Sequence, residues 1–175
     1  MSVRTLVLLS VLSAMMIVSQ VAMAALPNIE IVSLLIIVTT IFFGWRALYA
    51  VLVFILVEGL LYGFSLWFFT WLYLWPILVA LTMLFRRFIG ASPFGWALLS
   101  GAYGLFFGLF YAVVYLPIGG LNSMLAYWVA GFLFDIAHCV GNFILCLVLY
   151  KPLYLLLSRL TSDNLDAKVN LGRKK

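Results

Sequence analysis

The sequence predicts an all-α integral membrane protein with six transmembrane helices in one bundle. Of its 175 residues, 67% are hydrophobic and only 9% are charged, more apolar surface than a soluble domain of this length could bury. Long apolar runs are separated by short turns that contain Gly, Pro or Arg. Lys and Arg occur only in alternate turns and near the two ends. We expect one membrane domain over residues 1–160, followed by a basic cytoplasmic tail over residues 161–175.

The first apolar segment extends from about Thr5 to Ala25. Arg4 before it and Ala22-Met23-Ala24 at its end also fit a signal peptide with a small-residue cleavage site. We expect the segment to be retained, because an apolar stretch of about 20 residues is long enough to span the bilayer. Ser10 and Ala14, four residues apart, form a small-residue face that permits close approach of another helix.

Four further apolar segments follow, and we expect them over Ile31–Phe43, Ala47–Phe64, Leu66–Phe85 and Phe94–Leu116. The first of these is short for a full span, so it must tilt, include interfacial residues or be met by a re-entrant loop. The second contains the isolated carboxyl group of Glu58. In the third, we expect Trp67 to belong to an interfacial belt, whereas Trp71 and Trp75 lie deeper and one turn apart.

The sixth segment begins at Asn122, but its apolar run continues to Leu160, which is too long for one span. The preceding turn contains Pro117, Gly119 and Gly120. We expect Lys151-Pro152 to end the spanning part because proline disrupts a helix interior. Residues 153–160 would then form an interfacial helix.

This last segment gathers its polar residues on one helical face. At about 100° per residue, five side chains fall within an arc of roughly 80°: Trp128, Gly131, Asp135, His138 and Asn142. An ionisable group at membrane depth costs roughly 2.5 kcal/mol or more, so it turns toward a bundle interior or a wet cavity. The face is either an interhelical hydrogen-bonding stripe that locks the bundle or part of a binding site.

The basic residues predict the orientation of the chain. In a six-helix arrangement all ten fall on one side: Arg4, Arg46, Arg86, Arg87, Lys151, Arg159, Lys168, Arg173, Lys174 and Lys175. The three loops on the other side contain none. The positive-inside rule therefore predicts that both termini are cytoplasmic. Because the positive charge is next to the membrane, it does not indicate nucleic-acid binding.

With this orientation, the polar and aromatic groups converge on an outward-opening cavity. We predict that it is lined by Asn28, Glu30, Glu58, Trp71, Tyr115, Trp128, Asp135 and His138. No cofactor or metal is expected, since one His and two Cys on one helix are too few ligands for zinc. Cys139 and Cys146 are about 10 Å apart along that helix, too far for a disulfide.

Three stretches carry a resemblance to a known family: VSQVAMAALPNIEIVSLLIIV, VFILVEGLLYGF with the aromatic helix after it, and FDIAHCVGNFILCLVLYKPLYLLL. In their order and spacing, the chain resembles the substrate-binding S component of an energy-coupling factor (ECF) vitamin transporter. It is most similar to the branch that includes cobalamin-type S components. The likeness extends over about Arg4–Leu160.

The resemblance implies an ABC-type importer of the bacterial cell membrane. Its S component captures a vitamin outside, cobalamin being one candidate here, and topples in the membrane to release it inside. Its partners are a coupling transmembrane subunit and two ATPase subunits. Family members present a pair of alanines on the first helix to the coupling subunit. Ser10 and Ala14 occupy that place, with serine in place of the first alanine. No phosphate-binding loop is present, so the chain itself is not expected to be an enzyme.

Two other classes of function remain open from the residues. A structural membrane protein of cell-envelope machinery would need no wet cavity, and Glu58 and Asp135 would then be paired and dry. An intramembrane enzyme could use Asp135 and His138, three residues apart, as an acid–base pair. The residues do not identify the small molecule, although acidic groups without a basic partner on the outer side disfavour a carboxylate-rich ligand.

Overall fold

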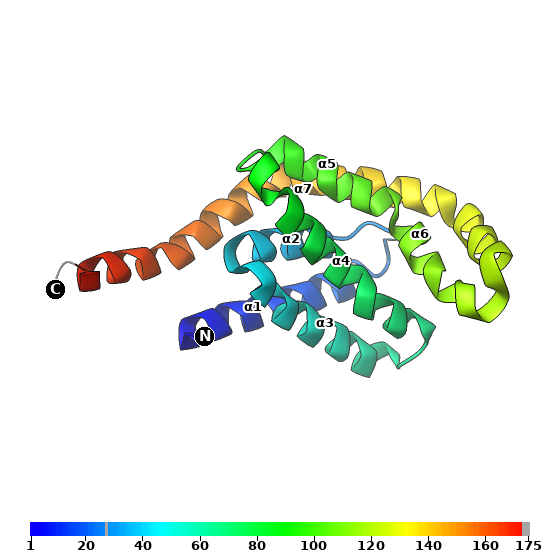
Figure 1. Ribbon diagram of the computed structural model, residues 1–175, viewed down its shortest axis with the longest axis horizontal. Coiled ribbons are helices and arrows are strands. Elements are labelled where there is room, and N and C mark those ends of the chain that lie inside the picture. Colours follow the sequence, from blue (N-terminus) through cyan, green and yellow to red (C-terminus); the bar gives the residue numbers. More distant parts are fainter. Residues whose placement is uncertain (27, 173–175) are drawn as a thin grey trace.

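The computed structural model describes residues 1–26 and 28–172, with side chains up to Thr161, and its regular structure within those residues is helical (Figure 1). The elements are α1 (Val3–Ala22), α2 (Val32–Phe43), η1 (Gly44–Arg46), α3 (Ala47–Tyr62), α4 (Leu66–Ile89), α5 (Pro93–Leu105), α6 (Phe107–Ala112), η2 (Val113–Tyr115) and α7 (Leu116–Gly172). Gly119 and Gly120 interrupt α7 with non-helical backbone. Gly120 has a φ of 72°, which glycine adopts without steric cost, so the chain turns here as predicted.

Four helical stretches among the described residues are long and apolar enough to cross a membrane: Val3–Ala22, Val32–Tyr62, Leu66–Ile89 and Phe107–Thr161. This confirms the predicted all-helical class, and the long apolar helices are consistent with a membrane protein. The number of spans stays a prediction. One reason is that α2 and α5, at 12 and 13 residues, are each shorter than the roughly 20 residues that cross about 30 Å of hydrocarbon.

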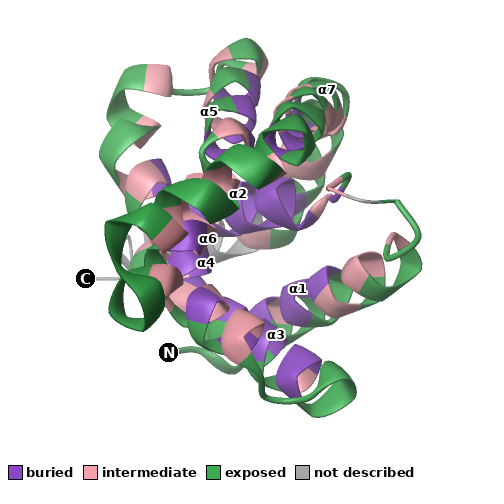
Figure 2. Ribbon diagram, turned by 90° about the vertical axis from the view of Figure 1, so that its right-hand side faces the viewer, coloured by how far each residue is buried: buried purple, intermediate pink, exposed green. Residues whose placement is uncertain are grey.

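Helix α2 lies at the centre of the molecule. Every residue from Val32 to Thr40 is buried, as expected of a helix that is apolar on all sides (Figure 2). Its hydroxyl groups are satisfied locally, since Thr39 and Thr40 donate to the carbonyl groups of Leu35 and Ile36 at 2.6 and 2.7 Å. Helices α1, α4 and α7 pack around α2, and α3 packs between α1 and α4.

Helix α5 lies alongside α7 over its whole length (Figure 1). Glycines make this approach close. A Cβ atom added to Gly104 would lie 2.8 Å from the carbonyl oxygen of His138, and one added to Gly101 would lie 3.1 Å from Cβ of Phe143. The backbone of α7 that carries His138 is therefore held by direct helix contact.

The predicted fifth segment is wrong as a single helix. The chain breaks at Phe106, whose φ and ψ are −96° and 3°, and continues as the separate short helix α6. The backbone N–H of Gly108, in the first turn of α6, donates to Oδ1 of Asp135 at 2.8 Å. Asp135 of α7 thus accepts a hydrogen bond from a backbone N–H that the break leaves without an intrahelical acceptor, so α6 can begin here.

The predicted end of the sixth segment at Lys151-Pro152 is also wrong. Helix α7 continues through Pro152, so residues 153–160 do not form a separate helix. Tyr150 and Leu157 are buried on the two sides of this proline. Their packing offsets the one backbone hydrogen bond that proline removes.

The basic segments lie at one end of the bundle. A guanidinium nitrogen of Arg4 donates to the carbonyl oxygen of Leu160 at 2.7 Å. A Cβ atom added to Gly44, beside Arg46, would lie 4.0 Å from a guanidinium nitrogen of Arg86. The start of α1, the α2–α3 turn, the end of α4 and the distal part of α7 therefore share one end, as Figure 1 shows.

Candidate binding site

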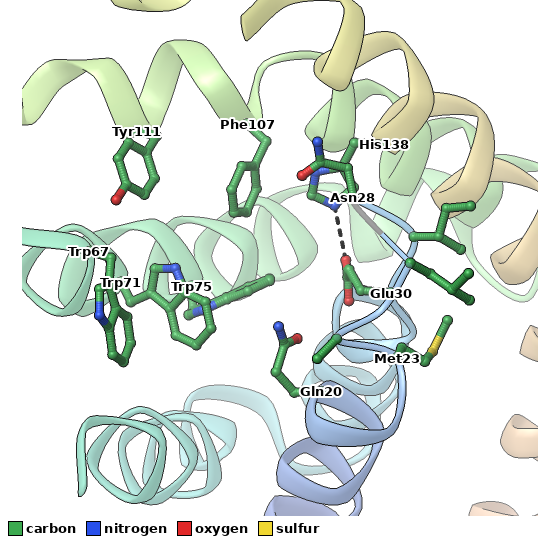
Figure 3. A pocket seen from close by; sticks show the side chains of 13 residues that line it. Gln20, Met23, Asn28, Glu30, Trp67, Trp71, Trp75, Phe107, Tyr111 and His138 are labelled. Carbon is green, nitrogen blue, oxygen red and sulfur yellow. Dashed lines mark hydrogen bonds and ion pairs between the residues drawn. The ribbon is translucent and has the colours of Figure 1, made fainter. Parts of the chain in front are cut away.

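A cavity of about 300 Å³ lies between the end of α1, the α1–α2 connection, the first half of α4 and α6 (Figure 3). It is lined by Gln20, Met23, Ala24, Leu26, Asn28, Ile29, Glu30, Trp67, Trp71, Trp75, Phe107, Tyr111 and His138. Four predicted site residues are among them: Asn28, Glu30, Trp71 and His138. The cavity lies by the first turns of α4, whereas Arg86 and Arg87 lie in its last turn.

One wall consists of three tryptophans at successive turns of α4. The ring centroids of Trp67 and Trp71 are 4.9 Å apart with planes at 74°, and those of Trp71 and Trp75 are 5.6 Å apart at 80°. Phe54 of α3 stacks on Trp71 at 5.4 Å. Trp75 is only 1% exposed, so surrounding packing holds this wall in place. Trp67, predicted to lie in an interfacial belt, lines the cavity.

The opposite wall is formed by Phe107 and Tyr111 of α6, one turn apart. The Phe107 ring lies 5.7 Å from Trp75 and 4.6 Å from the imidazole of His138. Tyr111 stacks on Tyr127 at 5.5 Å. Tyr115 stacks on the same Tyr127 at 4.5 Å and does not line the cavity. The predicted role of Tyr115 is thus taken by its neighbour one turn earlier.

Glu30 and His138 form the polar end of the cavity, and their side chains meet in Figure 3. Oε1 of Glu30 lies 3.1 Å from Nε2 of His138. The same carboxyl group accepts the backbone N–H of Ser33 at 2.8 Å and its hydroxyl at 2.5 Å. Glu30 therefore also caps the start of α2, where backbone N–H groups have no intrahelical acceptor.

The surroundings of Glu30 favour its charged form. Burial alone raises the pKa of the carboxyl group, but the hydrogen bond and charge of His138 and the two bonds from Ser33 outweigh it. The pKa of Glu30 is therefore lower than its ordinary value. Because a carboxylate only accepts hydrogen bonds, Nε2 of His138 is the donor in the contact.

The polar chain continues away from the cavity. Nδ2 of Asn142 donates to the hydroxyl oxygen of Ser33 at 3.1 Å. The four buried residues Glu30, Ser33, His138 and Asn142 thus join the α1–α2 connection, α2 and α7. On the polar face of α7, Asn142 locks helices together, while His138 both locks them and reaches the cavity.

Asp135 lies on the other side of the α6 wall. It lines a second cavity of about 510 Å³ that shares Asn28, Phe107 and Tyr111 with the first. A Cβ atom added to Gly108 would lie 2.5 Å from both carboxyl oxygens of Asp135, so a larger residue there would force the Asp135 side chain to move. Oδ2 of Asp135 is buried and has no hydrogen-bond partner among the described residues.

The remaining predicted residues lie elsewhere. Glu58 is 1% exposed on α3, with Oε1 lacking a hydrogen-bond partner within the described part of the chain, and it lines neither cavity. Trp128 is half-buried and also lines neither cavity. Ser10 and Ala14 are exposed on the outer face of α1, where the Ser10 hydroxyl donates to the carbonyl oxygen of Leu6 at 3.0 Å.

The chain matches no family model, no curated protein and no solved structure. Its chemistry must therefore be judged from the cavity. Indole and phenol rings offer stacking surface, Glu30 offers a negative charge, and the amides of Gln20 and Asn28 offer hydrogen bonds in both directions. This combination suits reversible binding of a small molecule.

The sequence-based prediction missed nine residues of the cavity: Gln20, Met23, Ala24, Leu26, Ile29, Trp67, Trp75, Phe107 and Tyr111. The spacing of the tryptophans at four residues was a usable signal, because it places all three rings on one face of α4. Phe107 had no such signal, since its orientation follows from the break at Phe106. Gln20 was visible as a polar residue near the end of an apolar segment.

Proposed function

We propose that this chain is the substrate-binding S component of an ECF-type ABC importer, which captures a vitamin or vitamin-like micronutrient outside a bacterial cell. The observation that carries the proposal is the aromatic cavity with Glu30 and His138 at its end. A concave, largely apolar site with a few fixed polar groups is the usual form of a small-molecule site. The proposed role is binding and delivery, without catalysis.

The proposed orientation has six membrane spans and both termini in the cytoplasm. It is supported by the gathering of Arg4, Arg46 and Arg86 at one end of the bundle, because positive residues flank the cytoplasmic surface. The cavity lies at the other end of α4 from Arg86 and Arg87 and would open outward. A captured molecule would therefore enter from outside.

The proposed partners are a coupling transmembrane subunit and two ATPase subunits. Ser10 and Ala14 are exposed on α1, where a second helix could approach closely. We expect the Ser10→Leu/Ala14→Leu variant to lose co-purification with a coexpressed ECF module, because the larger side chains separate the helices. Ligand binding by the isolated variant should be unchanged. A double variant that still assembles and transports would place the contact elsewhere.

The capture function is tested by native mass spectrometry of the purified full chain. We expect a small molecule to be retained by the wild type and lost from Trp71→Leu, which removes the central ring of the tryptophan wall. Trp45→Leu is the matched control, since Trp45 lies in η1 and is 55% exposed. Retention by neither wild type nor control would contradict capture.

A structural membrane protein of the cell envelope is the second candidate. The observation in its favour is that Glu30, Ser33, His138 and Asn142 bond to one another across three parts of the chain. Holding helices together would be a sufficient role for such a network, without any ligand. In that case Glu30→Gln would lower the thermal stability and no small molecule would be found with the wild type.

A further inference from the structure

We propose that the molecule bound in the cavity is a flat organic cation, with its positive charge on a ring nitrogen or a quaternary nitrogen. This inference rests on the proposed capture function and names the class of substrate for the same site. It follows from three features of the cavity: the sign of its charge, the saturation of its carboxylate and the arrangement of its rings.

Glu30 brings a carboxylate to the lining, and no lysine or arginine lies beside it. Among the thirteen lining residues, Glu30 is the one acidic residue, and none is Lys or Arg. Its partners His138 and Ser33 donate hydrogen bonds to it, and the imidazole of His138 is the other titratable group of the lining that contacts the carboxylate. A ligand in this cavity would lie in the field of the Glu30 carboxylate, which favours a positive charge over a negative one.

The carboxylate already accepts three hydrogen bonds, two from Ser33 and one from His138. What it offers a ligand is mainly its electric field, with little demand for another N–H donor. This suits a charge spread over a ring or shielded by alkyl groups better than a primary ammonium, which loses strong hydration and needs several acceptors.

The tryptophan wall complements such a ligand. The planes of neighbouring rings meet at 74° and 80°, so Trp67, Trp71 and Trp75 can contact a ligand from more than one direction (Figure 3). The indole face is the best side-chain partner for a cation, and it also stacks on flat rings. Phe107 and Tyr111 supply rings on the other side.

The size of the cavity narrows the class further. At about 300 Å³ it lies at the lower limit of small-molecule sites. This volume favours a molecule of one or two rings over a macrocycle such as cobalamin. Among vitamins and vitamin-like micronutrients, the cavity therefore favours the small ones.

The test compares three two-ring probes of similar shape with the purified full chain: 1-methylquinolinium as the cation, quinoline as the neutral form and 1-naphthoate as the anion. Binding is measured by quenching of tryptophan fluorescence and by isothermal titration. We expect the cation to bind at least tenfold more tightly than quinoline, and 1-naphthoate to bind more weakly than either. Equal or tighter binding of quinoline or 1-naphthoate would overturn the inference.

Two variants connect this preference to the cavity. Glu30→Gln should reduce the affinity for 1-methylquinolinium at least tenfold more than that for quinoline, because quinoline carries no charge for the carboxylate to attract. Trp71→Leu should weaken both, and Trp45→Phe neither. If Glu30→Gln does not fold, as judged by its thermal unfolding, the probe series on the wild type and on Trp71→Leu decides. An unchanged cation affinity in Trp71→Leu would place the probe outside the cavity and contradict the proposal.

Failure of this inference and failure of the proposed function are distinguishable. A neutral or anionic molecule retained in native mass spectrometry would overturn the cation inference and leave the capture function standing. Absence of any retained molecule, together with no binding of the three probes, would overturn both.

Discussion

The contact between Glu30 and His138 allows a quantitative test of what holds the cavity together. Replacing Glu30 by Gln substitutes one acceptor oxygen for a carboxylate that accepts three hydrogen bonds. Hydrogen bonds to charged groups contribute about 1.5–3 kcal/mol each, so losing one of them should lower the free energy of unfolding by that amount. At about 2–4 °C per kcal/mol, the melting temperature should fall by roughly 3–12 °C.

A double-mutant cycle separates this contact from the cost of each substitution. The variants are Glu30→Gln, His138→Gln and the double variant, and the assay is thermal unfolding in detergent followed by intrinsic fluorescence. We expect a coupling free energy of at least about 1 kcal/mol, because the two side chains touch at 3.1 Å. Glu30→Gln combined with Trp45→Phe is the control, and these distant changes should add to within about 0.5 kcal/mol. A coupling free energy below about 0.5 kcal/mol between Glu30 and His138 would refute the reasoning.

Three further predictions concern acidity, packing and orientation. The pKa of Glu30 is lowered by folding, so the difference in unfolding free energy between the wild type and Glu30→Gln should be fully present above the unfolded pKa of about 4.3. It should disappear as the pH falls through the lower pKa of the folded state. If the contact contributes nothing, unfolding measured across this pH range will show no change in that difference. Gly108→Ala should destabilise the protein by roughly 1–3 kcal/mol, since its Cβ would meet Asp135 at 2.5 Å. Gly131→Ala is the control and should not destabilise it, because Gly131 has open space around it. Equal melting temperatures of the two variants would contradict this packing. On intact cells, an impermeant thiol reagent should label a cysteine at position 122 and not one at position 46, and the reverse pattern would invert the proposed orientation.

The sequence was sufficient to predict the helical membrane class and most helix positions. Hydropathy and length locate apolar helices, and the short central α2 was recognisable from its 12-residue run. The breaks were less predictable. The break at Phe106 is tolerated because Asp135, far along the chain, accepts a hydrogen bond from the backbone N–H of Gly108 in the next helix. Helix α7, in contrast, continues through Pro152, and the burial of Tyr150 and Leu157 on its two sides offsets the lost hydrogen bond.

For the candidate site, the sequence indicated which residues share a face of one helix, as in the polar face with Asp135, His138 and Asn142 or the tryptophans of α4. Helical periodicity cannot say which faces meet. Only the tertiary structure placed His138 against Glu30, at a sequence separation of 108, and placed Asp135 in a different cavity. The physical reason is that these positions depend on how closely the helices approach one another. That distance is decided by packing at glycines such as Gly104 and Gly108. An added Cβ at these two positions would lie 2.8 and 2.5 Å from atoms of the facing helix.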